Sequence, residues 1–323
     1  MAYDLSIIIV NWNGGSLLSR CVETIINSSP NVRYEILIID NASTDDSLTQ
    51  LEQNETAATA IASQALRIFK NAHNRGFGAA NNQGFSLTKS PFVFMLNLDT
   101  EILPGTIDTL MTKINSDPGM GACGPRIVNP DGSLQVSVYF NPPRVWHTVL
   151  SQLWLYHLLP PRMRGELLLG WHWKHDRERS VPMLGGAAIL ARREMIEEVG
   201  GFDERFHMYA EDNEWCWRIT KSRWRLMFVP EAVVLHHGAH SAKMRWTPSE
   251  QLRVKLKAGF DFEHSVLPRW QLTANQLANY LVVNLQITGR KILGIQHPEL
   301  YVIKEMHREH LKRSLRNHLP EKL

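Results

Sequence analysis

The sequence predicts an α/β protein with a central, mainly parallel sheet, flanking helices and a helical extension at the C-terminal end. Three observations support this prediction. Short β-branched stretches alternate with helical stretches over residues 1–125, the apolar stretches there are continuous, and the pattern is helical from residue 249 onward. Continuous apolar strands separated by helices are typical of a parallel sheet that is covered on both faces.

The first half of the chain defines the expected sheet. Strands are expected at residues 5–10, 35–40, 66–70 and 92–99, with helices near 16–28, 44–63 and 78–88. Ligands of such open sheets bind at the carboxyl ends of the strands, where loops and helix N-termini converge. Polar, small or acidic residues stand at the carboxyl ends of all four strands, namely Asn11 to Asn13, Asp40 and Asn41, Asn71 to Gly78, and Asn97 to Asp99. We therefore expect a binding site at this edge.

The second half is less regular. The largely apolar stretch 145–159 is shorter than the ~20 residues of a spanning helix, so it either packs on the core or forms an interfacial segment facing lipid or acceptor. Next come a strand at 187–192, a short helix ended by Gly200 and Gly201, and two strands at 225–229 and 232–236. Helices are expected near 251–263, 271–288 and 299–317. We place the domain boundary between residues 245 and 246.

Composition indicates an ordinary globular protein, with 44% hydrophobic and 21% charged residues. The three cysteines, Cys21, Cys123 and Cys216, form no CxxC pair, which argues against a disulfide scaffold or a zinc site and suits a reducing cytosol. The chain begins without a basic n-region or a small-residue cleavage site, so a secretory signal is not expected. We expect a cytoplasmic protein, with peripheral contact at the inner face of the plasma membrane as a further expectation.

The positive charge of the chain is concentrated in its tail. Residues 251–323 hold twelve Lys and Arg against six Asp and Glu, while the first 250 residues are slightly acidic. This excess is either the solvated face of terminal helices or a surface for an anionic membrane or another polyanion. A nucleic-acid partner is not expected, because no recognition motif accompanies the charge.

The stretch NLDTEILPG has the features of half a metal site. An Asp-x-Asp pattern at a strand end brings two carboxylates to one hard divalent cation. Here Asn97 occupies the first position, so Asp99 is the only carboxylate of the pair. Mg²⁺ or Mn²⁺ would complete its shell with substrate phosphates and water. Taken alone, an Asp that ends a strand is more often a turn residue or a helix cap than a metal ligand.

Seven motifs follow one another along the chain: SIIIVNWNG, IIDNASTDDS, NRGFGAANNQG, NLDTEILPG, LGGAAILARRE, GGFDERFHMYAEDNEWCWR and PEAVVLHHGAHS. In their order and spacing, over roughly residues 4–241, the chain resembles the family 2 glycosyltransferases. It is most similar to the bacterial branch that includes rhamnosyltransferases of cell-surface polysaccharide biosynthesis. The resemblance implies the Rossmann-like GT-A fold and a hexosyltransferase that moves a sugar from a nucleotide diphosphate with inversion at the anomeric carbon.

The resemblance also implies the donor site. Asn11 and Asp40 would form the base pocket, with Asp40 accepting the N3 proton of uracil or thymine; a role of Asp40 as a turn or cap residue is the alternative and is compatible with base binding. Asn74, Arg75 and Asn81 would line the nucleotide and its phosphates, although Arg75 alone reads equally as a surface residue. Asn97 and Gly186 complete the predicted donor site, Gly186 by leaving room beside the sugar. Gly76 and Gly78 would let the backbone approach the diphosphate at a helix N-terminus.

Metal and base follow from the same motifs. The resemblance makes His236 the second metal ligand beside Asp99, five residues before Ser241, while His237 is the alternative; either could instead be structural. Asp212 takes the position of the catalytic base, which removes the acceptor's proton, although an isolated Asp there would read as a helix N-cap. Glu211 and Glu214 are expected to be helix-start and surface acids. Trp215 and Trp217 either stack on a sugar or pack in the core.

The sequence therefore predicts a metal-dependent inverting glycosyltransferase with Mg²⁺ or Mn²⁺ as cofactor. The expected donor is dTDP-rhamnose or a UDP-linked sugar, and the expected acceptor is a lipid-linked glycan or a polysaccharide. The alternatives are a sugar nucleotidyltransferase, for which the basic glycine-rich loop after the first strand is missing, and a non-catalytic nucleotide-sugar-binding protein. The oligomeric state stays open, a homo-oligomer included.

Overall fold

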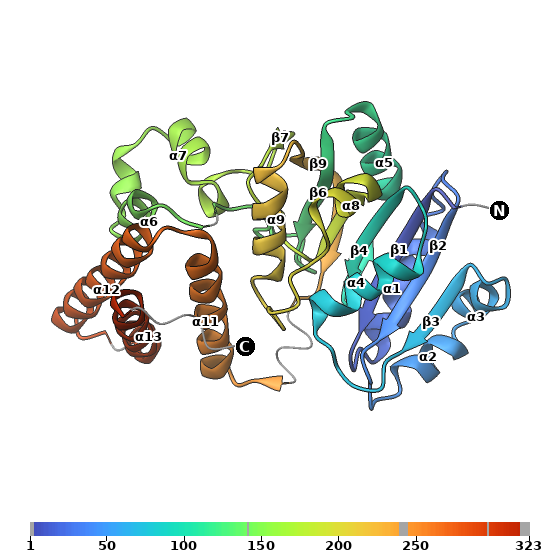
Figure 1. Ribbon diagram of the computed structural model, residues 1–323, viewed down its shortest axis with the longest axis horizontal. Coiled ribbons are helices and arrows are strands. Elements are labelled where there is room, and N and C mark those ends of the chain that lie inside the picture. Colours follow the sequence, from blue (N-terminus) through green and yellow to red (C-terminus); the bar gives the residue numbers. More distant parts are fainter. Residues whose placement is uncertain (1–2, 141, 239–244, 296, 317–323) are drawn as a thin grey trace. The chain divides into compact units, whose positions relative to one another are not determined.

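A computed structural model describes residues 3–140, 142–238, 245–295 and 297–316. The chain divides into two compact units (Figure 1). The first comprises residues 1–139 and 175–244, and the second comprises residues 140–174 and 245–323.

The first unit is built on a mixed sheet whose strand order is β3-β2-β1-β4-β8-β6-β9-β5, with β7 paired to β9 at the side. Its parallel half consists of the four predicted strands, β1 (Leu5–Asn11), β2 (Tyr34–Asp40), β3 (Leu66–Lys70) and β4 (Phe92–Asn97). All seven residues of β1 are buried, as expected for a central parallel strand covered on both faces. The predicted fold class is confirmed.

The other half of the sheet contains both strand directions. β8 (Ala188–Arg192) is antiparallel to β4, and β6 (Met120–Val128) is parallel to β9 (Arg225–His236). The short strands β5 (Thr100–Ile102) and β7 (Arg179–Ser180) are antiparallel to β9. The prediction of two strands at 225–229 and 232–236 is wrong, because β9 is continuous with an irregularity in its pairing to β6 after Val229. Pro230 follows there and has no N–H for the ladder.

Helices cover the sheet of the first unit (Figure 1). The expected helix at 44–63 is two helices, because Asn54 leaves the helical region at ψ 118° and accepts a hydrogen bond from the backbone N–H of Ala57. Within the described residues, the helices of this unit are α1 (Ser16–Asn27), α2 (Ser47–Gln53), α3 (Glu55–Ala62), α4 (Phe77–Leu87), α5 (Thr106–Ser116), α8 (Arg193–Val199) and α9 (Glu211–Lys221).

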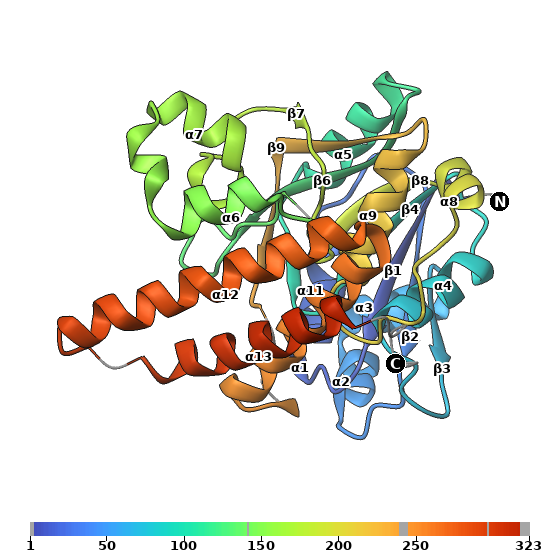
Figure 2. The same cartoon turned by 60° about the vertical axis from the view of Figure 1, so that its left-hand side comes forward.

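The second unit is helical. Figure 2 shows α12 and α13 lying alongside each other. Its α-helices are α6 (Val145–Gln152), α7 (Pro161–Leu168), α11 (Pro248–Val266), α12 (Arg269–Ile292) and α13 (Pro298–Leu315), with short 3₁₀ turns at Leu155–Leu158 and Gly170–His172. No helix within the described ranges is long and apolar enough to cross a bilayer.

The expected domain boundary at residue 245 differs from this division, since residues 140–174 group with the C-terminal helices. Both α6 and the segment before it contact α12. Gln152 Nε2 donates to Asn279 Oδ1 at 3.3 Å, and Asn275 Nδ2 donates to the carbonyl of Pro143 at 2.8 Å. The apolar stretch at 145–159 thus begins with a helix that packs on α12.

Candidate active site

A carboxylate and an imidazole meet beside the end of β4. Asp99 lies in the turn between β4 and β5, and His236 is the last residue of β9. The antiparallel register, which pairs Thr100 with His236, brings the two side chains together. His236 Nε2 lies 3.1 Å from Asp99 Oδ1, and both residues are buried. Asn97 Nδ2 lies 3.4 Å from the same imidazole nitrogen.

Gln135 determines which nitrogen of His236 carries a proton. His236 Nδ1 lies 2.5 Å from Gln135 Oε1. Because an amide oxygen can only accept, Nδ1 donates in this contact, and an imidazole with its single proton on Nδ1 would present the lone pair of Nε2 to Asp99. Two acceptors 3.1 Å apart repel each other unless a proton or a metal cation lies between them. The pair therefore fits a cation ligated by nitrogen and oxygen, a combination that suits Mn²⁺ better than Mg²⁺.

The pair would supply only part of a coordination shell. Within the described ranges, no group of three or more His, Cys, Asp or Glu side chains is arranged to hold a metal ion. A hard cation at Asp99 and His236 would take its other ligands from water or from phosphate oxygens. This agrees with the expectation that a site with one carboxylate ligand takes most of its coordination shell from a diphosphate and water.

The neighbouring histidine has a different environment. His237 Nε2 lies 2.9 Å from Glu101 Oε1, and Glu101 also pairs with Arg20 at 3.1 Å. His237 contacts Asp99 through its backbone N–H, which donates to the Asp99 carbonyl, so His236 is the histidine whose imidazole lies beside the Asp99 carboxylate. Ser241, which completed the motif, lies outside the described residues.

Asp212 is held at the start of α9. The helix begins at Glu211, and Ala210 precedes it in the left-handed region at φ 68°. Asp212 Oδ2 accepts a hydrogen bond from the N–H of Gly186 at 3.0 Å, and Oδ1 accepts one from the N–H of Asn213 at 2.8 Å. Burial raises the pKa of the Asp212 carboxyl, and the two N–H groups offset part of that rise. The aspartate is therefore a fixed carboxylate of increased basicity, and it is not the N-cap residue.

Gly186 lies directly against this carboxylate. A Cβ atom at residue 186 would lie 3.3 Å from both Cβ and Oδ2 of Asp212. A larger side chain would crowd the carboxylate and disturb the N–H that orients it. A glycine at this position therefore leaves room for the Asp212 carboxylate and for the N–H that orients it. That Gly186 also leaves room for a sugar stays a prediction.

Hydrogen bonds from two backbone N–H groups connect the surroundings of the Asp99–His236 pair to Asp212. The N–H of Asn97 donates to the carbonyl of Ala187 at 3.0 Å, and the adjacent Gly186 donates to Asp212. Asn97 is also next to the imidazole of His236. The segment 186–187 therefore links the Asp99–His236 pair to the start of α9 within one unit.

Glu211 begins α9, as predicted, but the prediction that it is a surface acid is wrong. Only 7% of Glu211 is exposed, and its Oε2 has no hydrogen-bond partner among the described residues. Burial, and then the charge of the adjacent Asp212, raises the pKa of Glu211 to about 8. Two adjacent buried carboxyls do not both ionise readily, so Glu211 keeps a proton while Asp212, which accepts two N–H groups, carries the charge.

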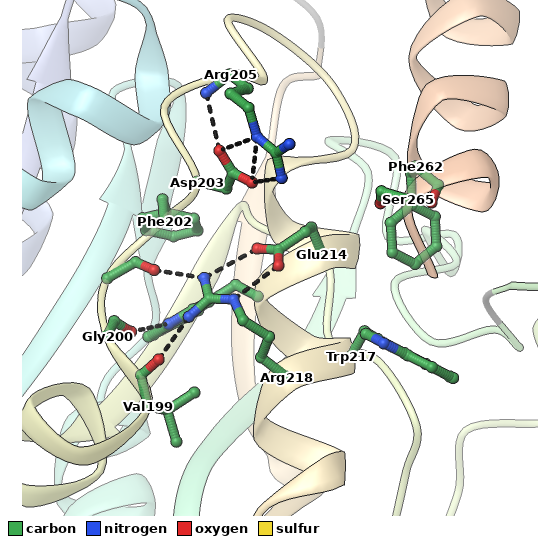
Figure 3. A network of polar contacts seen from close by, with 12 residues as sticks. Val199, Gly200, Phe202, Asp203, Arg205, Glu214, Trp217, Arg218, Phe262 and Ser265 are labelled. Atoms are coloured by element: carbon green, nitrogen blue, oxygen red, sulfur yellow. Dashed lines mark hydrogen bonds and ion pairs between the residues drawn. The ribbon is translucent and has the colours of Figure 1, made fainter. Parts of the chain in front are cut away.

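Glu214 lies in the first turn of α9, as predicted, but it is buried and ion-paired, so the prediction that it is a surface acid is wrong. Arg218 donates to both carboxylate oxygens of Glu214, at 2.7 and 2.9 Å, and to the carbonyls of Val199 and Gly201 (Figure 3). Glu214 and Arg218 thus fasten α9 to the loop that follows α8.

The two tryptophans of α9 differ in their surroundings. Trp215 is fully buried against Phe202 and Phe85 and donates from Nε1 to the carbonyl of Gly200 at 2.9 Å, so it is a core residue and does not stack on a sugar. Trp217 points away from the Arg218 network in Figure 3, and the ammonium of Lys221 lies 4.3 Å from its ring centroid.

The predicted base pocket is a buried polar network. Asn11 and Asp40 are opposite each other in the β1–β2 register, and Asn11 Nδ2 donates to Asp40 Oδ1 at 2.8 Å. The N–H of Ser43 donates to Asp40 Oδ2 at 3.2 Å, which is the turn contact considered as the alternative. Asn11 Oδ1 is buried without a hydrogen-bond partner among the described residues. Both oxygens of Asp40 thus accept one hydrogen bond each.

The predicted phosphate-side residues belong to the loop before α4 and to α4 itself. Asn74 Oδ1 accepts from the N–H of Gly76 at 2.9 Å, and Arg75 is 3.9 Å from Glu204. Asn81 is buried and donates to the carbonyl of Phe77 at 3.0 Å.

The close backbone approach expected at Gly76 occurs within the protein. A Cβ atom there would lie 2.7 Å from the carbonyl oxygen of His207, and the φ of Gly76 is 87°. The N–H of Phe77 donates to the same carbonyl at 3.3 Å. The His207 carbonyl thus accepts from one of the N–H groups at the start of α4 that have no partner within the helix. Glycine is required at residue 76 because a side chain there would clash with His207.

Sequence and structure comparisons identify the family. The model described as glycosyl transferase family 2 matches residues 6–169. The N-acetylglucosaminyl-diphospho-decaprenol L-rhamnosyltransferase of Mycobacterium tuberculosis H37Rv is 31% identical over 251 residues, which cover 73% of this chain and 77% of that protein. The pre-mycofactocin glycosyltransferase of the same strain is 27% identical over 243 residues, which cover 75% of this chain and 44% of that protein.

Two solved structures share the fold. GalNAc-T7 with UDP, GalNAc and Mn²⁺ has a TM-score of 0.59 and 18% identity, covering 97% of this chain and 56% of that one. The mannosyltransferase PcManGT from Pyrobaculum calidifontis, in complex with GDP-Man and Mn²⁺, has a TM-score of 0.54 and 16% identity, covering 98% of this chain and 86% of that one. The chain belongs to glycosyl transferase family 2 and has the GT-A fold. Family membership favours a glycosyltransferase over a sugar nucleotidyltransferase.

Sequence reasoning missed Gln135 and the burial of Glu211. Gln135 lies in the stretch after β6, and no spacing relates it to His236, 101 residues away. Glu211 begins an acidic first turn, a pattern that fits a solvated helix start equally well.

Proposed function

We propose that this protein is a metal-dependent inverting glycosyltransferase that transfers rhamnose from dTDP-rhamnose to a lipid-linked glycan. The observation that carries the proposal is the connection of the Asp99–His236 pair, through the segment 186–187, to the buried carboxylate of Asp212. A cation-binding pair and a held base are the two components that a single displacement at a sugar diphosphate requires.

Asp212 acts as the general base in this proposal. The acceptor hydroxyl gives its proton to Asp212 while its oxygen forms a bond to the anomeric carbon, and the bond from that carbon to the diphosphate oxygen breaks with its electron pair on the diphosphate. The raised pKa of Asp212 increases its basicity, and the N–H groups of Gly186 and Asn213 keep it oriented. Inversion follows because the acceptor attacks the face opposite the leaving group.

Asp99 and His236 would hold the divalent cation, with Gln135 fixing the ring of His236. When bound, the cation stabilises the negative charge of the departing nucleotide diphosphate. The rest of the donor would lie along the strand ends, with Asn11 and Asp40 at the base, and Asn74, Arg75 and Asn81 on the phosphate side. Asn97 and Gly186 would face the sugar. Asp40 can accept from a base N–H because each of its oxygens has a second lone pair.

The expected donor and acceptor are supported by the relatives. The M. tuberculosis relative named as an L-rhamnosyltransferase acts on N-acetylglucosaminyl-diphospho-decaprenol, and both fold neighbours were solved with Mn²⁺. A lipid-linked acceptor would bring the enzyme to a membrane, and its location at the cytoplasmic side stays a prediction. The oligomeric state stays open.

Isothermal titration calorimetry tests the metal site. dTDP-rhamnose is titrated into the protein with and without Mn²⁺, and Asp99→Ala and His236→Ala are compared with the matched control His237→Ala. We expect Mn²⁺ to strengthen donor binding in wild type and in the control, and to have little effect in the two test variants. Equal donor affinity with and without Mn²⁺ in the wild type would rule out the metal assignment.

The stereochemistry is tested independently. Transfer to a synthetic lipid-diphosphate acceptor is followed by proton NMR, and the anomeric configuration of the product is compared with that of the donor. We expect the opposite configuration. Retention of configuration would exclude a single displacement with Asp212 as the base.

A further inference from the structure

Exposed apolar side chains concentrate in the second unit. Among the described residues, eighteen large hydrophobic side chains are exposed, and fifteen of them belong to this unit. Clusters of exposed apolar side chains mark surfaces that bind a partner, whereas single ones are ordinary. The second unit therefore contains a candidate interaction surface.

Helix α12 carries much of this surface on the side opposite its buried face. Buried positions such as Leu272, Val283 and Ile287 face the unit. The other side has a stripe of large apolar side chains at spacings of four and seven residues, with exposed fractions of 71, 44, 52, 60 and 82% for Trp270, Leu277, Leu281, Leu285 and Ile292. Such spacing places them along one face of the helix, which runs the length of the unit in Figure 2.

The stripe continues into the turn after α12. Ile292, Leu293 and Ile295 are exposed by 82, 72 and 48%, and Gly294 between them has a φ of 70°. Exposure to water is unfavourable in free energy for three large aliphatic side chains at a turn. Their exposure is explained if the turn enters an apolar phase.

The charges of α12 indicate which partner fits. Its 24 residues include Arg269, Arg290 and Lys291 and no Asp or Glu. Arg290 and Lys291 stand just before the exposed turn, and neither forms an ion pair with a described residue. A basic helix with Trp and Leu on its apolar face is typical of helices that lie in the interface of an anionic bilayer. A second copy of the chain would offer the same positive charge on this helix, with no acid to neutralise it.

We propose that the outer face of α12, together with Ile292, Leu293 and Ile295, binds the surface of a bilayer that contains anionic phospholipid. The helix lies along the membrane, the turn inserts its aliphatic side chains below the headgroups, and the exposed Lys291 beside the turn contacts the lipid phosphates. This inference rests on the second unit and goes beyond the transfer reaction, since it concerns where the enzyme is held. It does not depend on the metal or the base.

Vesicle sedimentation with the full chain tests the proposal. The protein is mixed with vesicles of phosphatidylcholine alone or with one third phosphatidylglycerol, and the bound fraction is measured by ultracentrifugation. The apolar test variant is Ile292→Ser with Leu293→Ser, and its matched control is Leu103→Ser, an exposed leucine of the first unit. The charge variant is Arg290→Gln with Lys291→Gln, with Lys89→Gln as the exposed control. Circular dichroism checks that each variant folds.

The expected result is binding to the anionic vesicles that exceeds binding to phosphatidylcholine and decreases in high salt. The apolar variant should bind at least about tenfold more weakly, since removing one buried aliphatic side chain already costs about that factor. The charge variant should lose the preference for anionic lipid, and both controls should match wild type.

Two results would overturn the proposal. One is equal vesicle binding by wild type and both test variants, or no binding by any of them. The other is a wild-type dimer in sedimentation velocity that the apolar variant abolishes while vesicle binding is unchanged, which would assign the surface to a second copy. Donor titration on the same samples keeps this test separate, because failed vesicle binding with intact donor affinity refutes only the membrane surface.

Discussion

Replacing Glu211 by Gln removes a titratable group from the buried start of α9. The side chain of Glu211 is 7% exposed, and its Oε2 has no hydrogen-bond partner among the described residues. Gln has nearly the same shape as a protonated Glu, so the packing should persist. The substitution therefore isolates the cost of keeping this carboxyl protonated.

The size of the effect follows from the pKa of Glu211, which burial raises from an ordinary value of 4.5 to about 8. Between these two pH values the folded protein holds a proton that the unfolded chain has released. The free energy of unfolding therefore falls as pH rises, by about 1.4 kcal/mol per pH unit for one proton. At pH 7 the accumulated cost is roughly 3 kcal/mol as an upper estimate, because coupling to Asp212 spreads the titration over the pair.

The assay is urea denaturation of wild type and Glu211→Gln at pH 5, 6, 7 and 8, with the exposed Glu197→Gln as control. We expect the variant to be more stable than wild type, by an amount that grows from pH 5 to pH 8 and approaches about 3 kcal/mol near pH 7. Glu197→Gln should show no such trend. A stability difference that is the same at pH 5 and pH 8, or a variant less stable than wild type at pH 8, would refute the assignment of a proton to Glu211.

Two further substitutions test the surroundings of the site. Gln135→Leu removes the acceptor that holds Nδ1 of His236, and should weaken Mn²⁺ affinity in the donor complex by about 10 to 100-fold in calorimetry, as second-shell losses usually do; unchanged Mn²⁺ affinity would mean that Gln135 does not orient the ring. Arg218→Met leaves Glu214 buried without its partner and should lower the free energy of unfolding by about 3 kcal/mol in urea, and a loss below about 1 kcal/mol would place this pair among weak surface contacts.

Local sequence patterns were sufficient for the parallel half of the sheet. The four strands from β1 to β4 are continuous apolar segments, and Asn11, Asp40 and Asn97 end three of them as expected. The pattern did not reveal the break at Asn54, because helix propensity is similar on both sides and the cap is a single side-chain contact. Local sequence also predicts two strands in place of β9, because Pro230 interrupts the apolar pattern and the pairing with β6 on both sides of it is not visible in the sequence.

The site was predictable only in part, because it too depends on contacts between segments that are far apart in the sequence. Motif order placed Asp99, His236 and Asp212 in one protein, but the pairing of β5 with β9 that brings the first two together is a contact over more than one hundred residues. The burial of Glu211 depends likewise on segments far from it in sequence, since its Cβ lies 3.8 Å from the Cβ position that Gly78 of α4 would have. The grouping of residues 140–174 with the C-terminal helices required the contacts of α6 with α12.

The proposal that Asp212 is the catalytic base of an inverting glycosyltransferase is tested most directly by Asp212→Asn, assayed for donor binding and for transfer in parallel. Asn keeps the shape and can still accept from the N–H of Gly186, but it cannot take a proton from the acceptor. We expect donor affinity within a few-fold of wild type and a transfer rate reduced by about 10² to 10⁴-fold. A transfer rate equal to that of wild type, with donor binding intact, would contradict the account.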